Sequence, residues 1–241
     1  MESLFSNNKE ISKILSSKRY KNAFSPAHIL LTLYFFYKRI QGGRYSLAKF
    51  INVNESKART IIDCLIGSKI LNSSKGRAGS SLTNFGKELS ENLFNYYNFL
   101  KYDKNWNLGI LSVGNINSLI AIPFSKKNEM EINVLELRDQ IIKSGTIGAS
   151  IFYSIKKYGK FESLSFYQRQ NEKIQLEEKF KLAFNNLLED IKPLIITSEQ
   201  NQSWIIIAGT NNLDKNKSST KKELLKSTLI ATVQGILQFG F

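Results

Sequence analysis

Residues 44–83 read RYSLAKFINVNESKARTIIDCLIGSKILNSSKGRAGSSLT, and this stretch decides the fold of the N-terminal part of the chain. Apolar residues spaced i, i+3, i+4 and i+7 after Asn54 predict an amphipathic helix that ends at Gly67. This apolar stripe consists of Ala58, Ile61, Ile62 and Leu65. One or two turns of helix over 47–51 precede it, and a tight turn at 52–54 joins the two helices. The pattern therefore predicts two short helices separated by a brief turn.

A hairpin is predicted after these helices, and another helix before them. Short strands over 69–73 and 81–82 flank the loop 74–80, which consists of Gly, Ser, Ala, Arg and Lys. Upstream, Pro26 suits the first position of a helix, where its missing N–H costs nothing. A very short strand is expected at 44–46. The resulting order of helices, strands and basic loop is typical of a winged helix-turn-helix, which we expect at the N-terminus.

The excess of basic over acidic residues indicates which kind of molecule the protein binds. The 241 residues carry 34 Lys and Arg against 20 Asp and Glu, which gives a formal net charge of +14. Residues 1–100 hold 15 basic and 6 acidic side chains, so +9 of this charge lies there. Such a basic excess indicates a polyanionic partner, with nucleic acid ahead of a membrane surface. The alternative is a lysine-rich solvated surface that binds nothing.

Several other classes are disfavoured by the cysteine, histidine and hydropathy patterns. The single Cys64 permits no internal disulfide, and the single His28 leaves almost nothing for a zinc site or a Ser–His–Asp triad. No apolar run is long enough for a transmembrane helix, and the N-terminus does not have the pattern of a secretory signal. We therefore expect a cytoplasmic protein that is not an enzyme, needs no cofactor or metal, and does not bind a membrane.

The polar face of the predicted helix that follows Asn54 is expected to contact the bases of double-stranded DNA. With the apolar stripe turned inward, the opposite face is centred on Ser56 and Thr60, at 100° per residue. The N-terminal end of this helix would enter a major groove, where the flanking Lys57 and Arg59 reach phosphates or guanine. Asp63 is repelled by phosphate, so it lies away from the backbone or reads cytosine. The alternative is an ordinary amphipathic helix with a solvated face.

Three further cations complete the expected DNA interface. Arg44 lies in the short strand before the helix pair, and Lys75 and Arg77 lie among small residues in the hairpin loop. Cations on a flexible loop suit a wing that contacts phosphates or lies in the minor groove.

Beyond residue 104 the pattern changes to mixed α and β. Strands are expected at 109–113, 118–123, 147–155, 161–166, 193–197 and 203–208, and helices at 135–144, 173–191 and 220–239. An aromatic-rich stretch over 96–106 is expected to form a helical neck. The chain is thus predicted to be of the α+β class, with a winged-helix domain and neck over 1–104 and a mixed α/β domain over 105–241. The second domain would serve dimerisation or ligand sensing.

A ligand site and a dimer are the two roles considered for the C-terminal domain. Arg138 and Asp139 precede a run of small residues that includes Gly145 and Gly148, where exposed N–H groups could hold an anion. Tight packing at the end of a helix is the alternative for this run. The last helix, over 220–239, is apolar on several sides and must be buried within its own domain or against a second subunit. A homodimer is expected on this basis.

Several motifs of the chain resemble those of a known family. They are Gly43-Arg44-Tyr45, Ala58-Arg59-Thr60, Ser81-Leu82-Thr83 with Gly86, Leu137-Arg138-Asp139 and Gly145-Thr146-Ile147-Gly148-Ala149. Through them the chain resembles a family of archaeal predicted transcription regulators with a C-terminal domain of unknown function. The resemblance covers residues 25–234. It implies a winged helix, DNA binding and an archaeal cytoplasm, but it does not imply an effector.

The function expected from these observations is that of a sequence-specific DNA-binding transcription regulator, with control by a small ligand left open. Two other classes stay open. One is a winged-helix adaptor that binds the transcription machinery. The other is an enzyme fused to a winged helix, with Arg138, Asp139 and the 145–148 loop as its site.

Overall fold

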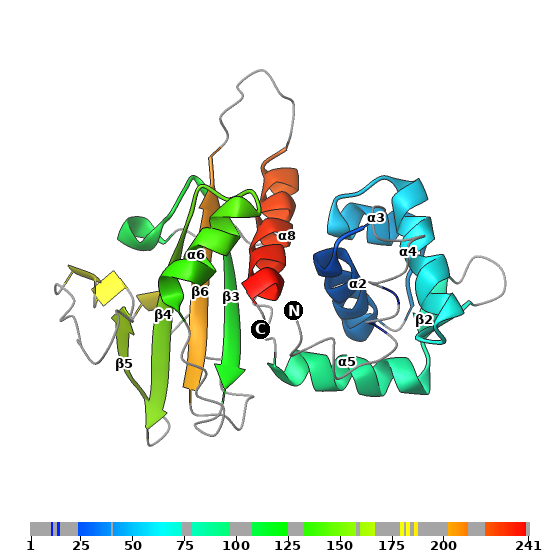
Figure 1. The fold of residues 1–241 in the computed structure, drawn as a ribbon, viewed down its shortest axis with the longest axis horizontal. Coiled ribbons are helices and arrows are strands. Elements are labelled where there is room, and N and C mark those ends of the chain that lie inside the picture. Colours follow the sequence, from blue (N-terminus) through cyan, green and yellow to red (C-terminus); the bar gives the residue numbers. More distant parts are fainter. Residues whose placement is uncertain are drawn as a thin grey trace. The chain divides into compact units, whose positions relative to one another are not determined.

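The computed structural model describes residues 11, 14, 24–39, 41–73, 79–96, 108–124, 133–157, 160–166, 179–180, 182–183, 186–187, 202–211 and 220–239. These residues form helices and two antiparallel sheets, so the chain is of the α+β class (Figure 1). The chain divides into two compact units, Met1–Phe94 with Ile236–Phe241, and Asn95–Gly235. The expected neck lies almost wholly outside the described residues.

The N-terminal unit is built from helices and one hairpin. Its described elements are α2 (Pro26–Lys38), α3 (Arg44–Ile51), α4 (Glu55–Gly67), β1 (Leu71–Ser73), β2 (Ser80–Leu82) and α5 (Asn84–Tyr96). The 3.6-residue periodicity of the sequence explains α4, because the stripe predicted to face inward is buried. Leu47 and Ile51 of α3 are likewise buried, and α3 packs on α4. The two helices therefore share the core of this unit.

The turn between α3 and α4 is fixed by two asparagines. Asn52 ends α3 in the left-handed conformation, with φ 52° and ψ 50°, and its N–H donates to the carbonyl of Ala48. Asparagine enters this region more readily than most residues do. Asn54 then caps α4, because its side-chain oxygen accepts a hydrogen bond of 2.8 Å from the backbone N–H of Lys57. The predicted turn at 52–54 is confirmed.

The hairpin is joined to the start of α3 by an isolated antiparallel bridge. The N–H of Gly42 donates to the carbonyl of Ser80 at 3.0 Å, and the N–H of Ser80 donates back at 2.8 Å. A Cβ at Gly42 would collide with the ring of Phe35, and Gly79 has φ +85° with its Cα against the backbone of Gly42. Both positions therefore need glycine.

The strand predicted at 44–46 is wrong. Gly43 is in an extended conformation and its carbonyl accepts from the N–H of Leu47 at 3.0 Å, so Arg44 is the first residue of α3. The residues after Gly43 place Leu47, Ala48 and Ile51 on one buried helical face. Burial of this face against α4 favours a helix over a strand for residues 44–51. The bridge to the hairpin is formed instead by Gly42, which pairs with Ser80.

The C-terminal unit contains a four-stranded antiparallel sheet in the order β3-β6-β4-β5. Its strands are β3 (Ile116–Phe124), β4 (Gly148–Lys157), β5 (Lys160–Phe166) and β6 (Gln202–Thr210), and its helices include α6 (Val134–Lys143) and residues 221–235 of α8 (Lys221–Phe239). The last strand in sequence, β6, lies between β3 and β4, which consequently run parallel to each other. Ile205, Ile206 and Ile207 of β6 are all fully buried, so both faces of this strand are covered.

Different segments cover the two faces of the sheet. On one face, Leu119 and Ile207 belong to a buried cluster with Leu111 and Leu187, the latter from the partly described region 179–187. On the other face, the Ser118 hydroxyl of β3 lies 2.8 Å from the Thr232 hydroxyl of α8. A Cβ at Gly235 of α8 would collide with the backbone of α6, so these two helices are in close contact.

Of the strands predicted for the C-terminal unit, one is not formed and another cannot be compared with the structure. The strand expected at 109–113 is wrong, since Gly109 has φ +53° and opens the 3-10 helix η2 (Gly109–Leu111). A residue with this φ interrupts extended backbone. The strand expected at 193–197 lies outside the described residues. Over the residues that are described, no helix is long and apolar enough to cross a membrane.

Candidate nucleic-acid interface

The outward face of α4 carries the four residues of this helix that were predicted from the sequence to contact DNA. Ser56 and Arg59 are exposed, and Lys57 and Thr60 are half-buried. Neighbouring residues of the same helix, including Ile61, are fully buried. The structure thus brings the four polar residues together on one side of α4, with their side chains away from the core.

The hydroxyl of Thr60 is already engaged on this face. Its Oγ1 donates a hydrogen bond of 3.0 Å to the carbonyl of Ser56, one turn earlier. A threonine hydroxyl has one proton and two acceptor lone pairs, so Thr60 remains able to accept a hydrogen bond. It is therefore suited to a donor such as the exocyclic amine of adenine or cytosine.

Arg59 and Asp63 form an ion pair along the same helix. Arg59 Nε lies 3.7 Å from Asp63 Oδ2, and the two side chains are 68% and 64% exposed. An exposed pair at this spacing contributes at most about 0.5 kcal/mol to stability. The pair affects the orientation of the Arg59 side chain, because the carboxylate of Asp63 lies beside the guanidinium on the polar face.

Lys57 acts through its charge on a half-buried histidine of α2. The imidazole of His28 has its pKa lowered to about 4, first by burial and then by the positive charge of Lys57. His28 Nδ1 accepts from the backbone N–H of Ser25 at 3.2 Å, and the Ser25 hydroxyl lies 2.7 Å from the same atom. The ring is therefore neutral at neutral pH, and its hydrogen bonds to Ser25 stabilise the start of α2.

Arg44 lies at the first turn of α3 and contacts Tyr45, which is not among the predicted DNA-binding residues. Its Nη2 donates to the Tyr45 hydroxyl at 3.0 Å, and its guanidinium carbon lies 4.8 Å from the centre of that ring. The hydrogen bond to Tyr45 is the main cause that raises the pKa of Arg44, and the negative charge of Glu55 adds to it. Arg44 is therefore near the start of α4. The sequence signal for this contact is an aromatic residue next to an arginine, and the structure shows that Tyr45 is 55% exposed.

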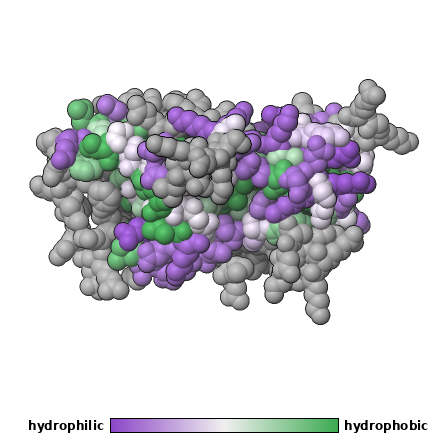
Figure 2. Space-filling view, turned by 90° about the horizontal axis from the view of Figure 1, so that it is seen from above, coloured by the Kyte–Doolittle hydropathy of each residue, from purple (hydrophilic) through white to green (hydrophobic). Residues whose placement is uncertain are grey.

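The two remaining cations of the expected interface, Lys75 and Arg77, lie outside the described residues. The structure fixes the strand residues on either side of them, since Ser73 pairs with Ser80. The space-filling view shows mostly hydrophilic residues on the described surface of the N-terminal unit, in the right-hand part of Figure 2.

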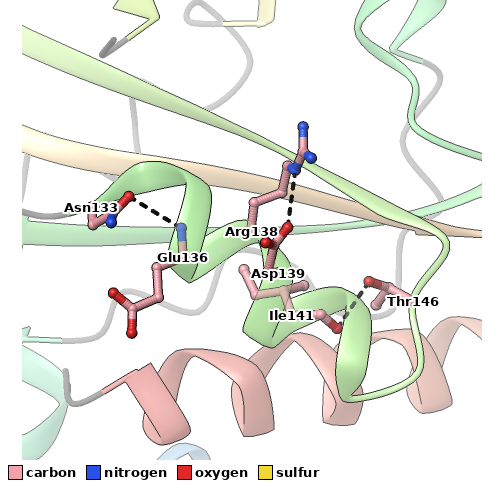
Figure 3. A network of polar contacts seen from close by, with 6 residues as sticks. All are labelled: Asn133, Glu136, Arg138, Asp139, Ile141 and Thr146. Atoms are coloured by element: carbon pink, nitrogen blue, oxygen red, sulfur yellow. Dashed lines mark hydrogen bonds and ion pairs between the residues drawn. The ribbon is translucent and has the colours of Figure 1, made fainter. Parts of the chain in front are cut away.

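Of the candidate ligand residues of the C-terminal unit, Arg138 and Asp139 lie on α6 (Figure 3), Gly145 lies in the turn after it, and Gly148 is the first residue of β4. Arg138 and Asp139 are exposed, and they pair with each other, Nε to Oδ1 at 3.7 Å. Gly145 has φ +116° and follows the C-terminus of α6, while a Cβ at Gly148 would approach Val113 to 2.8 Å. The tight connection from α6 to β4 thus explains why glycine occurs at these two positions. A ligand role for them stays a prediction.

Metal ligands do not cluster in the part of the chain that the structure describes. There, no three His, Cys, Asp or Glu side chains are placed to hold a metal ion. Cys64 is buried in α4.

Comparison with known proteins gives one informative similarity. No protein-family model matches the chain, and no curated protein matches it. Among solved structures, the chain is similar to the hypothetical protein PH0730 from Pyrococcus horikoshii OT3, with a TM-score of 0.52 and 20% sequence identity. The similarity covers 90% of this chain and 99% of that chain. At this identity it concerns the fold alone, and it extends over both units.

Proposed function

We propose that the protein is a sequence-specific transcription regulator that binds double-stranded DNA through a winged helix-turn-helix in its N-terminal unit. The helix pair α3 and α4, joined by the capped turn at Asn52–Asn54, has the order and spacing of that motif. The hairpin β1–β2 follows α4 directly, and the bridge between Gly42 and Ser80 supplies a third short strand. In this proposal α4 is the recognition helix.

The observation that carries the proposal is the division of α4 into two faces. Ala58, Ile61 and Leu65 are fully buried, while Ser56 and Arg59 on the opposite side are exposed. The outward residues include hydroxyl and cationic side chains, which can form hydrogen bonds to base edges and phosphates, together with the exposed carboxylates of Glu55 and Asp63. The hydroxyl and cationic residues among them fit the role of the helix that enters the major groove.

Charge supports the same proposal. The described residues 24–39, 41–73 and 79–94 contain eight Lys and Arg against four Asp and Glu, a balance of +4. Arg44 and Lys57 lie near the start of α4, at the end that would approach DNA. Lys75 and Arg77 add two charges in the loop of the hairpin. Neutralised phosphates release counterions, which is the main source of affinity in protein–DNA binding.

A role in dimerisation or ligand sensing is proposed for the C-terminal unit. The expectation of a homodimer began from the apolar character of α8. Leu225, Leu229 and Val233 of this helix are buried within the single chain, so they need no second subunit to cover them. The proposal of a dimer therefore relies on the gain in affinity when two recognition helices are joined and bind two half-sites.

Selection from a random duplex library by the full-length protein tests this function. We expect enrichment of a short sequence that the protein binds more tightly than random duplex by a factor of at least about 10³. Double substitution Ser56→Ala and Thr60→Ala, on the outward face of α4, should change the enriched sequence. The matched control Lys87→Ala, an exposed residue of α5, should leave it unchanged. A library that shows no enrichment after repeated rounds contradicts sequence-specific binding.

A further inference from the structure

We infer that Asp63 is a positioning residue that holds Arg59 for the recognition of a guanine base, an inference that rests on the function proposed above. The two side chains are separated by four residues, so they lie one above the other along α4. Both are exposed by about two thirds, at 68% and 64%, and the Nε–Oδ2 distance of 3.7 Å places the carboxylate at the inner edge of the guanidinium.

The chemistry of the guanidinium explains why this arrangement favours guanine. Arginine has five N–H donors in a rigid plane and no acceptor. Nε is the atom that lies beside Asp63, so in this inference the two terminal nitrogens of Arg59 act as the pair of donors toward the base. Guanine presents two acceptors, N7 and O6, on its major-groove edge, whereas adenine presents one acceptor and one donor. A fixed pair of donors therefore matches guanine and is mismatched with adenine.

The carboxylate limits the freedom of Arg59 before DNA arrives. An arginine side chain loses rotamer freedom when it is ordered at an interface, and this loss lowers affinity. Asp63 restricts the guanidinium in the free protein, so less freedom is lost when Arg59 reaches the base. Thr60 and Ser56 lie on the same face and leave the outward side of Arg59 uncovered, as its exposure shows.

The same carboxylate opposes contact with phosphate, so Asp63 has two effects of opposite sign. A negative charge on the DNA-facing side of a basic unit weakens binding to every sequence. Its pairing with Arg59 strengthens binding to sequences that contain guanine at one position. Removal of Asp63 should consequently strengthen or leave unchanged the binding to random DNA, while it weakens the preference for guanine. An acidic residue that is merely on the surface would produce no such split.

The test uses the full-length protein and three variants. Wild-type protein first selects its preferred duplex, and fluorescence anisotropy then measures the Kd for that duplex, for the same duplex with each base exchanged in turn, and for random duplex. We expect Arg59→Lys, which keeps the charge but loses the donor pair, to reduce the preference at one guanine by roughly 5- to 150-fold. Asp63→Ala should reduce the preference at the same guanine by about twofold, the effect expected of an exposed ion pair at this spacing, without weaker binding to random duplex.

The control is Glu88→Ala, which removes the same charge from an exposed position of α5. It should leave the base preference unchanged. If Asp63→Ala shifts the preferred and the exchanged duplex by the same factor, or if Arg59→Lys affects no guanine, the inference is wrong and the proposed function stands. If wild-type protein binds no duplex, the proposed function fails, and the inference fails with it.

Discussion

Two neighbouring residues of α4 should respond to substitution in opposite ways, because they belong to its two faces. Ile61 is fully buried between α4 and the rest of the N-terminal unit, and Thr60 is half-exposed on the polar side. Ile61→Ala removes buried apolar volume, and we expect it to lower the free energy of unfolding by about 2–5 kcal/mol. Thr60→Val keeps the shape of the side chain and removes its hydroxyl.

The expected change in stability for Thr60→Val is small. Its hydroxyl bond to the carbonyl of Ser56 lies on the exposed face, and surface changes of this kind stay within about 0.5 kcal/mol. The same variant should alter base preference in the selected duplex, because the proposed function assigns this hydroxyl to base contact. Urea denaturation followed by far-ultraviolet circular dichroism measures the first quantity, and anisotropy with selected and base-exchanged duplexes measures the second.

Two results would refute the assignment of the faces. One is a loss of more than about 1 kcal/mol for Thr60→Val, which exceeds what an exposed hydroxyl contributes. The other is an Ile61→Ala variant that keeps full stability. Ile61→Val is the milder control, with an expected cost of about 0.5–1.5 kcal/mol, and it should leave the base preference intact.

Three further predictions concern pH, the hairpin loop and assembly. His28 has a pKa of about 4 in the folded chain against 6.5 in the unfolded chain, so the unfolded state binds the proton first and stability is lost as pH falls from 6.5 to 4. The loss is at most about 3 kcal/mol, and His28→Gln should show a flatter stability curve over that range when urea midpoints are compared. Lys75→Ala and Arg77→Ala should weaken binding to selected and random duplexes by the same factor, and a change in base preference would place these side chains on base edges instead. Light scattering of full-length protein at micromolar concentration should give the mass of a dimer without DNA, and a mass of 27.5 kDa excludes the proposed dimer.

The parts of the fold that depend on local periodicity could be predicted from the sequence. The stripe Ala58, Ile61, Ile62 and Leu65 defines α4, and the two asparagines define the turn before it. The pairing of Gly42 with Ser80 could not be found in this way, because it joins one residue to a partner 38 positions away. The order of the C-terminal sheet is of the same kind, since β6 enters between β3 and β4 from a distant point of the chain.

The part of the candidate interface that lies on one helix could likewise be predicted from the sequence, whereas its contacts with other helices could not. The residues on the outward face of α4 follow from helical geometry, and the four-residue spacing of Arg59 and Asp63 is visible in the sequence. The electrostatic influence of Lys57 on His28 arises between two helices that are separate in the sequence, which periodicity does not give. The contact of Arg44 with Tyr45 was missed because those residues were expected in a strand, where successive side chains point to opposite faces.

The salt dependence of duplex binding tests most directly whether the N-terminal unit is a DNA-binding module. In the proposed function four cations contact phosphate, namely Arg44, Lys57, Lys75 and Arg77. Each neutralised phosphate contributes about −0.9 to the slope of log K against log salt, so we expect a slope of about −3.6 for each bound chain. Full-length protein titrated into random duplex between 50 and 200 mM salt should then lose affinity by roughly two orders of magnitude. A slope near zero, or no measurable binding at the lowest salt, would contradict the account.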